Sequence, residues 1–310
     1  MKIISGKAGM ELAKLISTQL DIPLVKCNLT PFADGESSVN IEESIRGEPC
    51  FVIQSTCPPV NDNLMELIFI IDALKRADAE SVTAIIPYFG YSRQDRKAKP
   101  RQPISAKVVA KMLSVAGADR IMSMDLHAGQ IEGFFDIPIV HLSSKPVFLE
   151  HILKYYEGQD LVFVSPDAGS MGRVSKMVQK LHFPVAVIDK RRDGSNVIKS
   201  VNLIGDVKDK IAIVFDDITD TGGTLCKSAE ILKERGALNV IGYITHGIFS
   251  GKAKEILLGV ESPFSKIYVS NTIPYIGNTY DKLEILDMSF VFTKVIKRVL
   301  TKGSVSSLFL

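Results

Sequence analysis

Short runs of apolar residues, many of them β-branched, alternate along the chain with longer segments in which apolar residues recur every three or four positions. The short runs have the length and composition of buried strands, and the longer segments have the period of helices. Strands that alternate with helices form βαβ units, so we expect an α/β fold of mostly parallel sheets flanked by helices. The predicted strands read CFVIQS from residue 50, SVTAIIPY from 81, RIMSMDL from 120, LVFVSP from 161, PVAVID from 184, IAIVFD from 211 and NVIGYITH from 239.

Two of the helical segments show a clear apolar face. The segment NLMELIFIIDALKRA, from residue 63, places on one side Leu64, Leu67, Ile68, Ile71 and Leu74. The segment LCKSAEILKERG, from residue 225, does the same with Leu225, Ala229 and Leu232, and its glycine at 236 predicts the end of the helix.

An internal repeat is visible in the same region. LKRADAESVTAIIPY from residue 74 aligns without a gap on LKERGALNVIGYITH from residue 232. This repeat indicates that the chain holds two copies of one α/β unit. The alternative is that any junction between a helix and a strand would give a similar alignment. With 310 residues, roughly two domains are expected. We predict an N-terminal domain at 1–143 and a C-terminal domain at 144–299, joined by the hinge-like HLSSKP, with 300–310 packing back on the first domain.

Composition restricts the possible partners. Lys and Arg number 37 against 35 Asp and Glu, and this net charge of +2 provides no general field for nucleic acid or an anionic membrane. No stretch approaches the ~18 apolar residues of a membrane span, and the N-terminus lacks the apolar run of a signal peptide. The four cysteines show no C-x-x-C spacing, which favours reduced thiols. We expect a soluble cytoplasmic protein with no nucleic-acid or membrane partner.

The segment VFDDITDTGGTL, residues 214–225, suggests a ligand. The turn Asp220, Thr221, Gly222, Gly223 and Thr224 follows a strand and opens a helix, where backbone N–H groups can bind a phosphate. Asp216 and Asp217 would repel that phosphate, but carboxylates accept hydrogen bonds from sugar hydroxyls. A ribose carrying a 5-phosphate offers hydroxyls to the carboxylates and a phosphate to the turn. The alternative, an acidic strand end before an ordinary helix cap, leaves two glycines and two threonines unexplained.

This segment resembles the phosphoribosyl-diphosphate loop of type I phosphoribosyltransferases and of ribose-phosphate diphosphokinases. Further motifs resemble the diphosphokinases, in the expected order and over nearly the whole length: FADGE at 32, PYFGYSRQDRK at 87, MDLHAGQIEGFFDIP at 124, VSPDAG at 164, DKRR at 189 and SVSSLF at 304. The resemblance is to the class activated by inorganic phosphate and inhibited by nucleoside diphosphate. It implies two similar domains, each like a type I phosphoribosyltransferase.

The resemblance also implies the reaction. A ribose-phosphate diphosphokinase (EC 2.7.6.1) transfers the diphosphoryl group of ATP to the anomeric hydroxyl of ribose 5-phosphate. The products are AMP and 5-phosphoribosyl 1-diphosphate, for nucleotide biosynthesis. The family further suggests a homo-oligomer, a hexamer built from dimers.

ATP must be held without a P-loop, because Gly251-Lys252 is followed by Ala253 instead of Ser or Thr and His246 stands where the first glycine belongs. The resemblance implies that the N-terminal domain contributes the ATP site, with FADGE reaching in from a neighbouring subunit. The implied contacts are Phe32, Asp34, Gly35, Glu36, Arg93, Gln94 and Asp95. Taken alone, FADGE reads as a turn with an acidic rim and YSRQDRK as a solvated charged loop.

The resemblance assigns Mg²⁺ to His127 and Asp167, which follow two predicted strands. From residue chemistry alone His127 is an unexpected magnesium ligand, because Mg²⁺ prefers oxygen. In IDKRRDGSNVIK an extended chain points Lys190 and Arg192 to one side and Arg191 to the other. The resemblance makes Lys190 the catalytic lysine of a closing loop and Arg192 its partner, which also contacts ribose 5-phosphate. A solvated basic turn is the alternative.

An effector site is the last expectation. By resemblance, phosphate or ADP would bind between subunits at Ser44, Arg46, Arg101, Ser304, Val305 and Ser306. Two other functions remain open at this point. A phosphoribosyltransferase would share the loop at 216–224 but would need neither RQDRK nor Lys190. A non-catalytic regulator that senses phosphoribosyl diphosphate would normally carry a DNA-binding extension or lack the lysine loop.

Overall fold

The computed structural model describes residues 1–310 except 168, 170, 179–182, 193–197 and 306–310. The chain divides into two compact units. Unit 1 comprises Met1–Ser144, Asn271–Tyr275 and the residues from Asp287 onward, and unit 2 comprises Lys145–Ser270 and Ile276–Leu286. None of the helices in the described part of the chain is long and apolar enough to cross a membrane.

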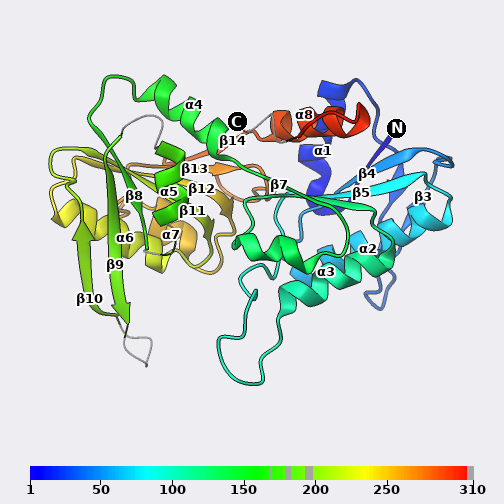
Figure 1. Cartoon of the computed structure of the whole chain (residues 1–310), viewed down its shortest axis with the longest axis horizontal. Helices are drawn as coiled ribbons and strands as arrows, with labels where there is room; N and C mark the ends of the chain where they lie inside the picture. Colours follow the sequence, from blue (N-terminus) through cyan, green and yellow to red (C-terminus); the bar gives the residue numbers. More distant parts are fainter. Residues whose placement is uncertain (168, 170, 179–182, 193–197, 306–310) are drawn as a thin grey trace. The chain divides into compact units, whose positions relative to one another are not determined.

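Unit 1 is built on a parallel sheet with strand order β1-β4-β5-β6-β7. Its strands are β1 (Lys2–Ser5), β4 (Pro49–Ile53), β5 (Ser81–Ile86), β6 (Arg120–Met124) and β7 (Ile139–Leu142). The helices are α1 (Met10–Leu20), α2 (Val60–Arg76), α3 (Ser105–Ala116) and α8 (Ser289–Leu300). Figure 1 shows α1 and α8 on one face of the sheet and α2 and α3 on the other.

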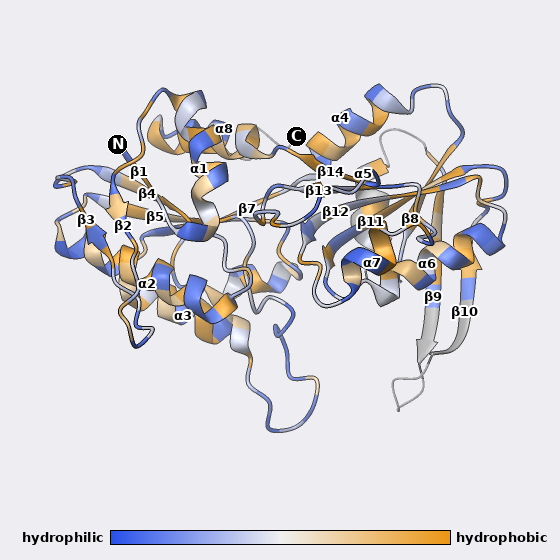
Figure 2. Cartoon of the chain, turned by 180° about the vertical axis from the view of Figure 1, so that it is seen from behind, coloured by the Kyte–Doolittle hydropathy of each residue, from blue (hydrophilic) through white to orange (hydrophobic). Residues whose placement is uncertain are grey.

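Shorter elements complete unit 1. They are the 3-10 helices η1 (Lys7–Gly9) and η2 (Gly129–Phe134) and the two-stranded antiparallel ribbon of β2 (Cys27–Asn28) and β3 (Asn40–Ile41). One core lies between the sheet and α2 and α3, where Val52 and Ile86 pack with Leu67 and Leu113. Helices α1 and α8 also bury apolar residues, among them Ile16 and Phe292. In Figure 2 the strands are mostly hydrophobic, and the long loop between β5 and α3 is mostly hydrophilic.

Unit 2 is built on a sheet with strand order β10-β9-β8-β11-β12-β13-β14, of which only β10 runs antiparallel to its neighbour. Its strands are β8 (Leu161–Ser165), β9 (Val185–Arg192), β10 (Ile198–Ile204), β11 (Ile211–Thr219), β12 (Asn239–Gly247), β13 (Lys266–Ser270) and β14 (Leu283–Leu286). Its helices are α4 (Lys145–Tyr155), α5 (Met171–Val178), α6 (Gly223–Glu234) and α7 (Ala253–Leu258).

Aromatic stacking consolidates the core of unit 2. The ring of Phe215 on β11 stacks on those of Phe163 and Tyr243, with centroid distances of 5.6 Å to each. Phe148 of α4 meets Tyr243 edge-on at 5.4 Å. Ring pairs in such geometries contribute beyond the area that they bury, so they hold α4 against β8, β11 and β12.

The strand orders support the duplication inferred from the repeat. The order β1-β4-β5-β6-β7 in unit 1 corresponds to β8-β11-β12-β13-β14 in unit 2. In each unit a helix and a pair of strands, β2–β3 or β9–β10, separate the first strand from the second along the chain. Helices α2 and α6 end at Arg76 and Glu234, and β5 and β12 begin at Ser81 and Asn239, so both boundaries keep the spacing of the sequence repeat. A chance similarity between two helix-to-strand junctions would not reproduce the strand order.

The division into units differs from the predicted boundaries in two places. The sequence placed Asn271–Tyr275 and α8 in the C-terminal domain, but the structure assigns both to unit 1. Helix α8 packs against α1, where Gln19 Nε2 donates to Ser289 Oγ at 2.6 Å. Because these contacts join residues far apart in the chain, sequence adjacency could not reveal them.

Candidate active site

The acid pair of unit 2 lies inside β11, because this strand extends to Thr219, beyond the predicted run IAIVFD. The ladder with β12 continues to the pair Thr219 and Gly247. Asp217 is 7% exposed, and its N–H donates to Asp216 Oδ1 at 2.9 Å. Burial raises the pKa of Asp216 well above its ordinary value, and the nearby carboxylates of Asp217 and Asp167 raise it further.

The glycine turn follows directly. Gly222 has φ of +77° and is the N-cap of α6, a backbone conformation that favours glycine. A Cβ at Gly222 would also lie 2.8 Å from the side chain of Leu257. At Gly223, by contrast, a Cβ would meet nothing within 4 Å, and Thr221, Gly223 and Thr224 are exposed. The start of α6 is therefore open to a ligand, and its first-turn N–H groups suit an anion.

Loops from the neighbouring strands border this turn. Asp167 follows β8, where its carbonyl accepts from Ser165 Oγ at 2.7 Å. After β12, Ile248 N–H donates to Thr219 O and Ser250 N–H to Asp220 O, each at 2.9 Å. The segment 248–250 thus supports the turn, a role that no local pattern in the sequence indicates. The structure brings Asp167, Asp216 and the turn together at the carboxyl edge of the unit 2 sheet.

In unit 1 the FADGE segment forms a turn, as its composition indicates. Gly35 N–H donates to Phe32 O at 3.0 Å, Phe32 N–H donates to Glu36 O at 2.8 Å, and Glu36 N–H donates to Asp34 Oδ1 at 3.1 Å. Gly35 has φ of +92°. The turn therefore has a defined shape, while the side chain of Phe32, its first residue, is 60% exposed.

The YSRQDRK segment belongs to the long loop between β5 and α3, which stands out from unit 1 in Figure 1. Gln94 anchors this loop to the start of α3, because its Oε1 accepts from Ser105 Oγ at 2.6 Å and its carbonyl from Ala106 N–H at 3.3 Å. Asp95 accepts from Gln130 Nε2. Two motifs that are separate in the sequence therefore lie side by side, and Arg93 is exposed beside them.

His127 lies in the turn that follows β6. It is partly buried, in a segment that begins at Asp125 with φ of 38° and leads into η2. Within the described part of the chain, no group of three or more His, Cys, Asp or Glu side chains is arranged to hold a metal ion. Mg²⁺ needs no such group, because it commonly binds through one or two protein ligands, water and substrate phosphates.

Comparison with known proteins identifies the family. A family model described as the N-terminal domain of ribose phosphate pyrophosphokinase matches residues 1–117, and one described as the phosphoribosyl synthetase-associated domain matches residues 195–310. Ribose-phosphate pyrophosphokinases from Campylobacter jejuni and Thermotoga maritima are 48% and 47% identical to this chain, over 100% of its length and 99% and 98% of theirs. The chain belongs to the ribose-phosphate pyrophosphokinase family.

A solved structure agrees with this assignment. The crystal structure of phosphoribosylpyrophosphate synthetase from Mycobacterium smegmatis is similar with a TM-score of 0.92 and 39% identity, covering 97% of this chain and 99% of that one. The predicted α/β fold of two similar domains is thus confirmed. Membership in the pyrophosphokinase family also decides between the diphosphokinase and the phosphoribosyltransferase, which the segment 214–225 alone could not separate.

For some candidate residues the structure does not describe the side chain. The backbone of Lys190 and Arg192 belongs to β9, where Lys190 pairs with Val201 of β10, but their side chains are outside the described part. Ser306 is outside the described residues altogether. These assignments therefore remain predictions.

The remaining effector candidates lie on separate segments of unit 1. Ser44 and Arg46 lie between β3 and β4, where Arg46 Nε is 3.6 Å from Asp78 Oδ2 on the surface. Arg101 is exposed in the loop between β5 and α3, and Ser304 and Val305 follow α8.

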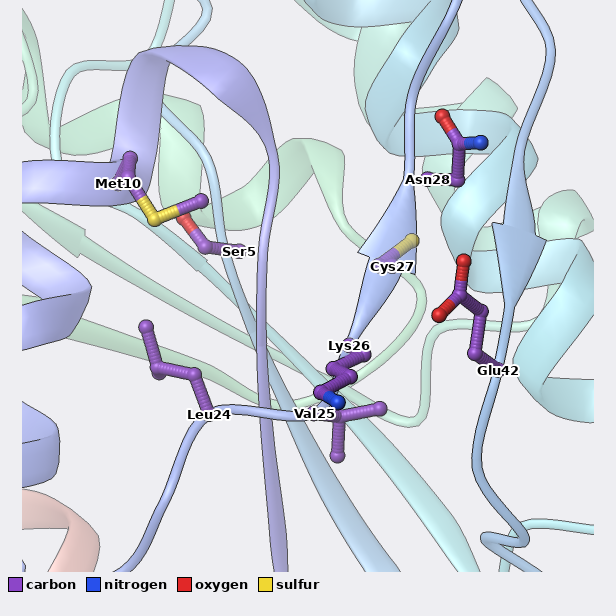
Figure 3. A pocket seen from close by; sticks show the side chains of 8 residues that line it. All are labelled: Ser5, Met10, Leu24, Val25, Lys26, Cys27, Asn28 and Glu42. Atoms are coloured by element: carbon purple, nitrogen blue, oxygen red, sulfur yellow. The ribbon is translucent and has the colours of Figure 1, made fainter.

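A pocket of about 460 Å³ lies near the base of the β2–β3 ribbon, beside the start of α1 (Figure 3). It is lined by Ser5, Met10, Leu24, Val25, Lys26, Cys27, Asn28 and Glu42. Its lining is mixed apolar and polar, and it includes none of the predicted site residues. The FADGE turn lies in the connection between the two strands of this ribbon.

Three of the four cysteines should be unreactive in the folded protein. All four are free thiols, and burial raises the pKa of Cys27, Cys50 and Cys57 to about 11. At pH 8 only about one thiol in a thousand is then ionised, and the thiolate is the reactive form. We expect iodoacetamide to label these three cysteines far more slowly in the folded than in the urea-unfolded protein, as measured by mass spectrometry. Equal labelling rates in the two states would contradict this expectation.

Proposed function

We propose that this chain transfers the diphosphoryl group of ATP to the anomeric hydroxyl of ribose 5-phosphate, giving 5-phosphoribosyl 1-diphosphate and AMP. The family assignment over the full length supports this reaction. The single structural observation that carries it is the combination on β11 and α6 of an acid pair with an open glycine turn. A single ligand that bears hydroxyls and a phosphate can bind to the acid pair and to the turn at the same time.

The sugar phosphate binds at the carboxyl edge of the unit 2 sheet. The carboxylates of Asp216 and Asp217 accept hydrogen bonds from the ribose hydroxyls. The 5-phosphate binds at the turn formed by Asp220, Thr221, Gly222, Gly223 and Thr224, where it receives N–H groups and threonine hydroxyls. Exposure at Gly223, where a Cβ would meet nothing within 4 Å, supports a close approach of this anion.

ATP binds to unit 1. Arg93, Gln94 and Asp95 contact the nucleotide, and the anchoring of Gln94 and Asp95 to Ser105 and Gln130 supports a preformed loop. Phe32, Asp34, Gly35 and Glu36 contact it from the turn of a neighbouring subunit, which agrees with the exposure of the Phe32 ring. The enzyme would then be a homo-oligomer, a hexamer by analogy with the family, and a monomer would lack part of its ATP site.

Mg²⁺ is the proposed cofactor, with His127 and Asp167 as its protein ligands. The acidic edge of unit 2 fits a cation, because the pKa of Asp216 is raised by the neighbouring carboxylates of Asp217 and Asp167, whose mutual repulsion a divalent ion would relieve. When bound, the ion neutralises charge on the phosphate oxygens of ATP. The other steps depend on the side chains of the chain itself.

The transfer forms a bond between the anomeric oxygen and the β-phosphorus of ATP and breaks the bond from that phosphorus to the oxygen that leaves with AMP. Lys190 and Arg192 stabilise the negative charge on the transferred group, and Arg192 also contacts ribose 5-phosphate. Both residues lie on β9, which pairs with the edge strand β10 of the unit 2 sheet. Closing this segment over the substrates would exclude water, which would otherwise compete as acceptor.

Regulation and location complete the proposal. The enzyme belongs to the class activated by inorganic phosphate and inhibited by ADP, and acts in the cytoplasm. The effector binds at Ser44, Arg46, Arg101, Ser304, Val305 and Ser306.

One assay tests the reaction and its regulation. We expect AMP release from ATP that requires both ribose 5-phosphate and Mg²⁺, because neither water nor a free nucleobase replaces the sugar as acceptor. Phosphate should increase the rate, and ADP should inhibit in a manner not purely competitive with ATP. Activity that required 5-phosphoribosyl 1-diphosphate and a nucleobase would instead indicate a phosphoribosyltransferase. Ligand binding without any AMP release would indicate a regulator.

A further inference from the structure

The turn that carries His127 has a strained beginning. Asp125, directly after β6, has φ of 38°, in the left-handed region that non-glycine residues rarely adopt. The end of β7 holds it there. Asp125 N–H donates to Leu142 O at 2.9 Å, and the Asp125 carboxylate accepts from Ser144 N–H at 3.1 Å and from Ser143 Oγ at 3.2 Å. The end of β7 and the two serines after it therefore maintain the left-handed conformation of Asp125.

A second contact from β7 reaches the next residue of the turn. Leu126 N–H donates to His141 Nε2 at 2.9 Å, and the other ring nitrogen, Nδ1, lies 2.6 Å from Glu132 Oε1 of η2. A backbone N–H can only donate, so Nε2 must carry the lone pair and Nδ1 the proton. Nδ1–H then donates to the Glu132 carboxylate, which orients the ring. Glu132 lies within the motif MDLHAGQIEGFFDIP but has no assigned role there, and His141 lies outside every motif.

The two contacts together determine the position of the peptide before His127. The side chain of Leu126 is 4% exposed and its N–H is bound to His141, so this residue is held by both packing and hydrogen bonding. The direction of the His127 side chain depends on the backbone that precedes it. Groups that hydrogen-bond a ligand side chain directly commonly set its orientation, and replacing them typically costs about 10- to 100-fold in affinity or activity. His141 acts one residue earlier, through the backbone of Leu126.

We infer that His141 is a positioning residue of the active site, which orients His127 through the Leu126 peptide and is itself oriented by Glu132. The inference rests on the proposed role of His127 in the reaction. His141 touches neither substrate in this account; it acts only through the turn.

Two substitutions at residue 141 separate positioning from bulk packing. In His141→Gln the side-chain amide extends about as far as Nε2 and retains an acceptor for Leu126 N–H. In His141→Asn the shorter amide retains a partner for Glu132 but loses that acceptor. Hydrogen exchange of the Leu126 amide in the metal-free full-length protein should accelerate by about tenfold in His141→Asn and remain near wild type in His141→Gln. The turnover number should fall by at least about tenfold in His141→Asn, with little change in the KM of ribose 5-phosphate, and recover in His141→Gln.

His151 of unit 2 provides a matched control. It is also a partly buried histidine with two polar partners, Tyr243 OH at 2.8 Å from Nδ1 and Glu284 Oε1 at 3.7 Å from Nε2, but it belongs to unit 2, whereas the turn belongs to unit 1. His151→Asn should leave both exchange at Leu126 and turnover within about threefold of wild type. Wild-type exchange at Leu126 in His141→Asn, or equal defects in His141→Asn and His141→Gln, would overturn the positioning role and leave the proposed function intact. Full activity of His127→Ala would instead overturn the proposed role of His127.

Discussion

Replacement of Lys190 by alanine should lower the turnover number by about three orders of magnitude while ATP still binds. Phosphoryl-type transfer depends on positioning and on neutralising the charge of the transferred group, and loss of one preorganised donor typically costs about 10²- to 10³-fold. Lys190 is proposed to act only after both substrates are bound, because the ATP contacts come from unit 1 and the sugar contacts from β11 and α6. Initial rates of AMP release, together with calorimetric titration of Mg²⁺–ATP, would measure the two effects separately.

Arg191→Ala is the control for this experiment. It removes one positive charge from the same strand. The sequence pattern of an extended chain predicts opposite sides for Lys190 and Arg191. We expect a change in turnover of less than about tenfold in this variant. A Lys190→Ala enzyme with near wild-type turnover would remove Lys190 from the mechanism, and an Arg191→Ala enzyme with the same defect would show that net charge matters more than position.

Replacement of Asp216 by asparagine should abolish sugar binding and yet stabilise the unliganded protein at neutral pH. The pKa of Asp216 is raised by burial and by the carboxylates of Asp217 and Asp167, so the folded state binds this proton more tightly than the unfolded state. Its ionisation therefore destabilises the fold as the pH rises from the unfolded value through the raised folded value. Asparagine is neutral at every pH and avoids that cost, but it offers ribose hydroxyls only a neutral acceptor.

Thermal unfolding in the presence of EDTA would measure this effect. The melting temperature of Asp216→Asn should exceed that of the wild type by about 3 °C at pH 8, and the difference should shrink toward pH 4. Ribose 5-phosphate should raise the melting temperature of the wild type but not of the variant, and AMP release should fall by at least about 100-fold. Glu157→Gln, which removes an exposed acid of the same unit, should change none of these. A variant less stable than the wild type at pH 8 would show that the carboxylates do not repel one another in the apo protein.

A histidine and a glutamine illustrate which parts of the site the sequence could not show. His141 lies outside every motif, and Gln130 lies within MDLHAGQIEGFFDIP without an assigned role, yet they bind Leu126 N–H and the Asp95 carboxylate. Each of these contacts joins segments at least 15 residues apart in the chain. Composition and periodicity report only on neighbours along the chain or along one helix or strand, so contacts of this kind leave no local signal.

The sequence also misplaced the end of the strand that carries the acid pair. The sequence placed Asp216 and Asp217 at the end of a strand, because apolar residues stop at Phe215. In the structure β11 continues to Thr219, since its ladder with β12 does not depend on the polarity of the side chains. Asp217 is buried, and its carboxyl group lies close enough to that of Asp216 to raise the pKa of Asp216. Their joint role in binding ribose remains a prediction.

The sequence alone predicted β4, β5, β6, β8, β9, β11 and β12 among the strands, the faces of α2 and α6, the repeat and the motifs that led to the family. Each of these depends on side-chain chemistry over a few neighbouring residues. The tertiary structure decided that α8 and Asn271–Tyr275 belong to unit 1, that the five-strand order is shared by both units, and that β7 holds the turn of His127. These features depend on which distant segments bury their apolar faces and backbone groups together. A linear pattern allows many such pairings, and only packing selects one.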